Sequence, residues 1–158
     1  NKYIIFLCIK LFIMIYIVLI VLLTFIVMEF VAFALHKYVM HGFLWSWHKD
    51  HHQPKYEKLE KNDRFFLVFA IPSWLGIMFG LMYNINWFFS VGLGIALYGI
   101  CYVIVHEIII HQRLPFFKRL NSKYIKGIRF AHKIHHKNQG KFHGVCFGML
   151  IVPLKYFK

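Results

Sequence analysis

The sequence predicts an all-α integral membrane protein with a histidine-rich cap on one side of the bilayer. Three observations predict this fold class. Hydrophobic residues make up 59% of the 158 residues and charged residues only 16%, whereas a soluble domain usually carries about 25% charged residues. Several apolar runs are long enough to cross a bilayer, and ten of the eleven histidines fall into four clusters beside those runs. The length indicates one domain, residues 1–158, and the three cysteines lack the spacing of a disulfide framework.

The first apolar run covers residues 3–35 and is interrupted by only three polar residues. A transmembrane helix needs about 20 apolar residues, so we assign 1–35 to the first span. A signal peptide is the alternative, but its apolar core would be about 7–15 residues long and a small-residue cleavage site would follow it. At about 1.5 Å per residue, the helix can extend beyond the hydrocarbon and carry His36 and His41 to the aqueous face.

The middle of the chain is a polar segment followed by a hairpin of apolar helices. Residues 36–64 form the first histidine segment, and 45–64 within it are polar and of mixed charge. Two further candidate spans, 65–83 and 87–110, are joined by the short polar turn 84–86. Together they make a transmembrane hairpin over 65–110, which returns the chain to the side that it left. We expect three glycines of the second span to allow close helix contacts: Gly92, Gly94 and Gly99.

The distribution of charge predicts which side the histidines face. The second histidine segment, 111–143, contains nine Lys and Arg residues and no acid. Cytoplasmic loops carry such an excess, so we expect both histidine segments on the cytoplasmic side. The net charge of +13 also raises nucleic acid as a partner, but the basic residues border apolar runs and suit an anionic membrane face, so we expect no nucleic acid. The tail, 144–158, holds an apolar stretch too short to span, and we expect it to be interfacial or re-entrant.

The histidines repeat one pattern twice. A pair separated by a five-residue step stands at the end of an apolar span, and a triplet with the spacing H-x-x-H-H follows in the next polar segment. The first pair and triplet are His36 and His41, then His48, His51 and His52; the second are His106 and His111, then His132, His135 and His136.

The spacing within each triplet and each pair has a structural consequence. Positions i, i+3 and i+4 share one face of a helix, so each triplet can present three imidazoles in one direction. A step of five residues turns about 140° in a straight α-helix, so the members of each pair do not converge there. A π-bulge or a helix end would bring them together. We therefore predict irregular helix at His36–His41 and at His106–His111.

Ten neutral imidazoles at one membrane surface suit a transition metal such as iron or zinc. Ten ligands are too many for one ion, so two ions with about five nitrogens each is the simplest interpretation. A carboxylate-bridged di-iron site needs several glutamates in Glu-x-x-His pairs, and this chain has only six acids in all. The full prediction is therefore three to four transmembrane helices with a cytoplasmic histidine-rich dimetal cap, whose ligands are the ten clustered histidines.

Three other ionisable residues need an interpretation. Glu29 and Glu107 lie near membrane depth, where an ionisable group is by default a functional candidate. Glu107 follows a predicted ligand and can orient an imidazole, although snorkelling or helix pairing are alternatives. His143 belongs to no cluster, and we expect it at the surface.

Longer strings around the histidines carry a family resemblance over about residues 28–158. They are MEFVAFALHKYVMHGFLWSWHKDHHQP, ND followed by aromatics at 62–66, YGICYVIVHEIIIHQR, AHKIHHKNQGK, and FGML near the end. In these strings the chain resembles the bacterial β-carotene hydroxylases of the membrane fatty acid hydroxylase and sterol desaturase superfamily. It departs from their pattern at Glu107, where the family often has Asp, and at His143, where an acidic or small residue is expected.

The resemblance implies a non-haem di-iron monooxygenase of the bacterial inner membrane, which uses O2 and electrons from ferredoxin. The implied reaction adds a hydroxyl group to ring carbon 3 of each β-ionone ring, converting β-carotene through β-cryptoxanthin to zeaxanthin. The family's metal ligands carry over to the ten clustered histidines. The carotenoid would enter from the lipid, and a basic cytoplasmic face would help to dock an acidic electron carrier.

Two alternatives stay open. Another substrate within the superfamily would make the protein a fatty acyl or sterol hydroxylase, or a desaturase. In a different class, the chain would be a membrane metal-binding carrier or sensor without redox chemistry. Ligands in the middle of the spans would favour transport, whereas these clusters lie at the ends of the spans.

Overall fold

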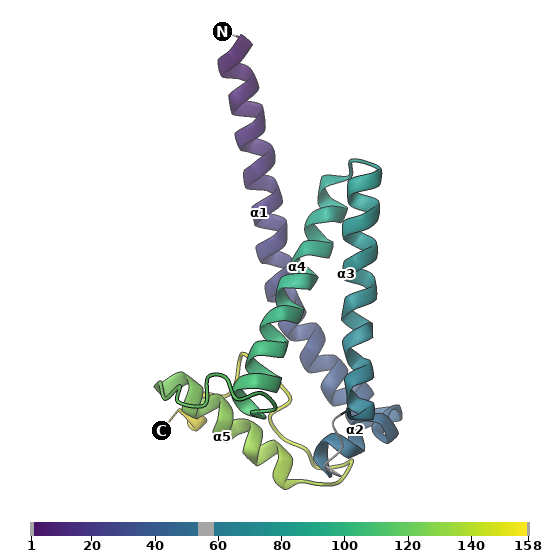
Figure 1. Cartoon of the computed structure of the whole chain (residues 1–158), viewed down its shortest axis with the longest axis vertical. Helices are drawn as coiled ribbons and strands as arrows, with labels where there is room; N and C mark the ends of the chain where they lie inside the picture. The colour runs from purple at the N-terminus through teal and green to yellow at the C-terminus, as the bar shows by residue number, and fades with distance from the viewer. Residues whose placement is uncertain (1, 54–58, 158) are drawn as a thin grey trace. The chain divides into compact units, whose positions relative to one another are not determined.

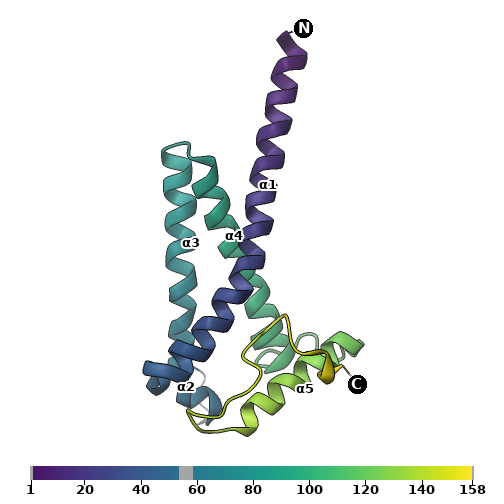
Figure 2. The ribbon, with the colours of Figure 1, turned by 180° about the vertical axis from the view of Figure 1, so that it is seen from behind.

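The computed structural model describes residues 2–53 and 59–157, and every regular element in these two ranges is helical (Figures 1 and 2). The all-α prediction is therefore confirmed. Residues 54–58 of the predicted histidine segment 36–64 lie outside the described residues. The chain divides into two compact units, one of which carries all ten clustered histidines. The prediction that 1–158 forms a single domain stays a prediction.

Three helical stretches in the described ranges are long and apolar enough to cross a membrane: Lys2–Phe43, Lys61–Met82 and Asn86–Ile110. Their bounds agree with the predicted first span and hairpin to within a few residues, except that the first stretch continues beyond residue 35 as far as Phe43. The protein is thus an integral membrane protein. The predicted interfacial or re-entrant tail contains one short 3-10 helix, η4 (Leu154–Tyr156), and is otherwise irregular.

The first unit contains α1 (Lys2–Ala34) as far as Met28, together with most of α3 (Phe65–Met82) and α4 (Asn86–Tyr102). α3 and α4 form the predicted hairpin. The turn between them is tight because Asn84 adopts a left-handed backbone conformation, with φ of 55°, which asparagine tolerates better than most residues.

Glycines set the distance between the helices of this unit. A Cβ atom added to Gly92 would lie 2.6 Å from the backbone nitrogen of Ile77, so α3 and α4 touch through their backbones there. A Cβ atom on Gly94 would lie 2.6 Å from the Thr24 side chain of α1. These two contacts confirm the predicted role of the glycines. The prediction for Gly99 is wrong, because a Cβ atom there would meet nothing within 4 Å.

The second unit contains residues 29–66 and 100–158. Its hydrophobic core is small: Ile128 and Ala131 of α5 pack with Val152 of the tail. Its helices are the end of α1, η1 (Leu35–Phe43), α2 (Trp45–His52), η2 (Lys61–Arg64), η3 (Val103–Ile110), α5 (Lys123–Lys137) and η4.

Two of these elements, η1 and η3, are π-helical segments, and they cover the two five-residue steps. The His111 amide donates to the His106 carbonyl at 2.9 Å, which is the i→i+5 bond of a π-helix. This winding places residues five apart above one another, so the rings of His36 and His41 lie 5.3 Å apart and those of His106 and His111 4.6 Å apart. The predicted irregular helix at both steps is confirmed.

Helix α5 has two opposite faces. It begins after Ser122, whose hydroxyl accepts a hydrogen bond from the Ile125 amide at 3.2 Å and so caps the helix. Successive residues are about 100° apart around a helix, which puts the three histidines of α5 on one side. The opposite side carries four exposed lysines: Lys123, Lys126, Lys133 and Lys137.

Candidate metal centre

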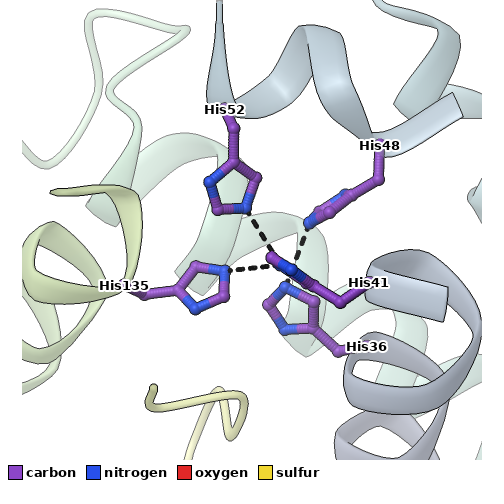
Figure 3. A group of neighbouring side chains, drawn as sticks. All are labelled: His36, His41, His48, His52 and His135. Carbon is purple, nitrogen blue, oxygen red and sulfur yellow. Dashed lines mark hydrogen bonds between the residues drawn. The ribbon is translucent and has the colours of Figure 1, made fainter. Parts of the chain in front are cut away.

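All ten clustered histidines converge in the second unit. Nine of them form two groups in which the potential ligand nitrogens all lie within 4.8 Å of one another. The first group contains His36, His41, His48, His52 and His135 (Figure 3), and the second contains His51, His106, His111 and His132. Each triplet therefore divides between the groups. On α2, His51 belongs to the second group while His48 and His52 belong to the first. On α5, His135 belongs to the first group while His132 belongs to the second.

In the first group the Nε2 atoms face one another. His41 Nε2 lies 3.1 Å from His52 Nε2 and 3.3 Å from His135 Nε2, and His36 Nε2 lies 3.1 Å from His48 Nε2 (Figure 3). These residues come from η1 and α2, which are adjacent in the sequence, and from α5, which is distant from both. His135 is fully buried and the other four are buried or half-buried.

The Nδ1 atoms of the first group point outward, and each one donates to an oxygen. Four of these oxygens are backbone carbonyls of residues 138–147, and the fifth is Oδ1 of Asn62, 2.7 Å from His48 Nδ1. The four carbonyl contacts are His36 to Phe147 at 3.0 Å, His41 to Lys141 at 3.1 Å, His52 to Asn138 at 3.0 Å and His135 to Val145 at 2.7 Å.

These contacts fix the tautomer of each ring. A carbonyl oxygen only accepts hydrogen bonds, so Nδ1 must carry the proton and Nε2 of a neutral imidazole is left with a bare lone pair. Five bare lone pairs then converge at short distance, an arrangement that is repulsive by itself and attractive around a cation. The donor set therefore fits a transition metal ion that accepts imidazole nitrogen.

The second group has the same character. Nε2 of His111 and Nε2 of His132 lie 2.8 Å apart. Among the described residues, Nε2 of His51 and Nε2 of His136 are buried without any hydrogen-bond partner. The ring of His136 lies 4.5 Å from that of His132 and 4.8 Å from that of His51 in the second group. It also stacks 4.5 Å from the ring of His52, so the tenth histidine stands where the two groups meet.

Carboxylates support the second group. His51 Nδ1 lies 2.9 Å from Glu60, and His106 Nδ1 lies 2.6 Å from Glu107. Arg113 joins the Glu107 carboxylate to Asp63 through contacts of 2.8 Å and 2.7 Å. These ion pairs raise the pKa of Arg113, with Asp63 the largest cause. Carboxylates that accept from Nδ1 orient the ring and increase its basicity, as in many metal sites.

Burial favours the neutral form of seven of these histidines. It lowers the pKa values of His48, His52, His111 and His135 to about 3 and that of His136 to about 2. The pKa values of His51 and His132 fall well below 6.5 for the same reason. A neutral imidazole is the form that binds metal.

Sequence reasoning missed three supports of the two groups. Glu60 and Asn62 follow α2 and accept hydrogen bonds from Nδ1 of His51 and His48. The string N-D at 62–63 was the sequence feature that could have indicated this support. The third support, the carbonyl oxygens of residues 138–147, gives no signal because any residue type supplies them. His143 is exposed, as predicted.

The fold and the two histidine groups together define an integral membrane protein with a candidate dinuclear metal centre. The family described as "Fatty acid hydroxylase" matches residues 21–152, and the chain belongs to that family. It is therefore an enzyme, a hydroxylating oxidoreductase, as the sequence motifs indicated.

Individual relatives agree with this assignment. The chain is 42% identical over 137 residues to a β-carotene hydroxylase of Pantoea ananas, covering 85% of this chain and 77% of the relative. It is 36% identical over 141 residues to a β-carotene hydroxylase of a Paracoccus species, covering 85% and 83%. A chloroplastic β-carotene 3-hydroxylase 2 of Arabidopsis thaliana is 34% identical over 132 residues, covering 80% of this chain and 42% of the relative. No solved structure matches the chain.

Proposed function

We propose that the protein hydroxylates ring carbon 3 of the β-ionone rings of β-carotene, giving β-cryptoxanthin and then zeaxanthin. The observation that carries the proposal is the convergence of bare histidine nitrogens in two groups. Its support is the 42% identity to a β-carotene hydroxylase. An unactivated C–H bond does not yield to acid–base chemistry, so a redox-active metal is required.

The two groups would hold two non-haem iron ions. His36, His41, His48, His52 and His135 would bind one ion, and His51, His106, His111, His132 and His136 the other. When bound, the irons would supply the oxidation that inserts an oxygen atom from O2 into the C–H bond.

The protein's own residues prepare the site for this chemistry. Carbonyl, amide and carboxylate oxygens on Nδ1 hold all five rings of the first group and two of the second, those of His51 and His106. Burial lowers the pKa of most of the histidines and so favours the unprotonated form. Phe147 packs its ring 5.2 Å from that of His41 and 5.4 Å from that of His135, which helps to exclude water from the first group.

The proposed location and partners follow from the chain's charge and apolar helices. The histidine groups would lie on the cytoplasmic side of the bacterial inner membrane, because the segment after residue 111 is strongly basic. β-Carotene would arrive from the lipid phase. Electrons would come from ferredoxin or a similar acidic carrier, which the lysine face of α5 would attract.

Product analysis in a carotene-accumulating bacterial host tests the proposal. We expect zeaxanthin from the wild-type chain, none from His135→Ala, which removes a buried imidazole of the first group, and normal product from His143→Ala, which removes an exposed one. Unchanged carotene beside hydroxylated or desaturated fatty acyl or sterol products would favour the alternative substrates. Metal uptake without any oxidised lipid would favour a carrier or sensor.

A further inference from the structure

One carboxylate oxygen of Glu29 accepts hydrogen bonds from three consecutive backbone amides. Its Oε1 accepts hydrogen bonds from the amides of Met149 at 3.1 Å, Leu150 at 2.9 Å and Ile151 at 2.9 Å. Glu29 is only 6% exposed, so these bonds satisfy a buried polar group within the first apolar helical stretch.

A glycine makes this turn possible. A Cβ atom on Gly148 would lie 2.3 Å from the carbonyl oxygen of Ile151, a distance that real side chains do not reach. Any larger residue at this position would open the turn and separate the three amides that converge on Glu29.

The same segment supports the first histidine group. We call residues 138–152 the strap. Its first part supplies the four carbonyls that accept from Nδ1 of His36, His41, His52 and His135, and its last part is held by Glu29. Figure 2 shows this segment as the irregular chain that follows α5. The strap is therefore fixed at α5, at the histidines and at Glu29.

Glu29 and His36 belong to one continuous helical stretch and are seven residues apart, which is roughly 10 Å along a helix. Glu29 consequently fixes the strap relative to the helix that carries the first two ligands. The carbonyl positions in turn set the orientation of the imidazoles. The second group differs, because His51 and His106 are supported by Glu60 and Glu107 instead.

We propose that Glu29 is a positioning residue, which anchors the strap and thereby orients the first histidine group for metal binding. The inference rests on the proposed metal centre. Loss of the accepting oxygen releases the strap, weakens metal binding by the first group and spares the second.

The test compares variants of the full-length chain, purified in detergent and loaded with ferrous iron. Glu29→Leu removes the acceptor at similar volume, Glu29→Gln keeps an accepting oxygen, and Gly148→Ala disrupts the same turn from the strap side. His143→Ala is the control, because it alters an exposed residue of the strap. The readouts are iron per chain by elemental analysis and amide hydrogen exchange of the peptide that contains residues 145–152.

We expect Glu29→Leu and Gly148→Ala to lose one of the two irons and to exchange amide hydrogens faster in this peptide, while Glu29→Gln and His143→Ala resemble the wild type. A merely structural role of Glu29 would not remove one iron selectively. Full iron loading of both Glu29→Leu and Gly148→Ala would overturn this inference alone. A wild-type chain that binds no iron would overturn the proposed function and this inference with it.

Discussion

His51 Nδ1 lies 2.9 Å from Oε2 of Glu60. A carboxylate therefore supports the second histidine group at this point, whereas most histidines of the first group donate from Nδ1 to backbone carbonyls. Burial raises the pKa of Glu60 to about 7, and a nearby metal cation would favour its charged form. The two histidine groups are therefore chemically different, although both are lined by imidazole.

Replacing Glu60 by glutamine tests this difference. Glu60→Gln keeps a hydrogen-bond acceptor for His51 but removes the negative charge, and loss of such a support typically lowers metal affinity about 10–100-fold. We expect the weaker binding at one of the two positions only, measured by competition with a metal chelator. Asp50→Asn is the matched control on α2, because the Asp50 carboxylate accepts from the Lys61 amide. Equal affinities of Glu60→Gln and the wild type would show that the charge is unimportant.

The membrane helices could be predicted from the sequence because hydropathy is a local property. The span assigned to 1–35 corresponds to α1 at Lys2–Ala34, and the hairpin assigned to 65–110 corresponds to α3, α4 and η3. The two π-helical segments could also be predicted, since a five-residue step between converging side chains excludes a regular α-helix.

The division of the histidines into two groups could not be predicted. His51 and His52 are neighbours on α2, yet they belong to different groups, because one side of α2 faces η1 and the other faces η3. The role of the strap in supporting the histidines could not be predicted from the sequence either. Its carbonyls carry no sequence signal, and its acceptor, Glu29, lies more than a hundred residues away in the chain.

The lowered histidine pKa values predict how the stability of the metal-free protein depends on pH. Above the ordinary histidine pKa of about 6.5, folded and unfolded chains are both neutral at these positions. As the pH falls from there towards 3, these histidines become protonated in the unfolded chain but stay neutral in the folded chain. The unfolded state therefore binds more protons, and the free energy of unfolding decreases. We expect the thermal midpoint of the metal-free chain to fall steadily on acidification through this window.

The variant His135→Ala provides the comparison for this pH dependence. It removes one buried ring, so its midpoint should fall less steeply with acid than that of the wild type, whereas His143→Ala should follow the wild type. A wild-type midpoint that is flat between about pH 6.5 and 4 would mean that the rings are accessible to protons in the folded state.

The contact between Gly92 and Ile77 predicts a difference between two alanine substitutions in α4. Gly92→Ala would force its Cβ to within 2.6 Å of the Ile77 nitrogen, and such overpacking typically costs about 1–3 kcal/mol. We expect a lower thermal midpoint in detergent. Gly99→Ala is the matched control, because its Cβ meets nothing within 4 Å. Equal midpoints for the two variants would contradict the close approach of α3 and α4.

The lysine face of α5 predicts an electrostatic contribution to reduction by an acidic carrier. Its four lysines point away from the histidines of the same helix, so reversing their charge should leave metal binding intact while weakening the encounter. We expect the double variant Lys126→Glu with Lys133→Glu to be reduced by ferredoxin roughly tenfold more slowly at low salt, and Lys126→Arg with Lys133→Arg to match the wild type.

Raising the salt concentration from roughly 0.05 M to roughly 0.5 M should slow reduction of the wild type and narrow the difference in rate between the wild type and the glutamate variant, because salt screens exposed charges. Stopped-flow measurement of the reduction rate checks both. Rates that are independent of salt and equal in all three proteins would exclude this face as the docking surface.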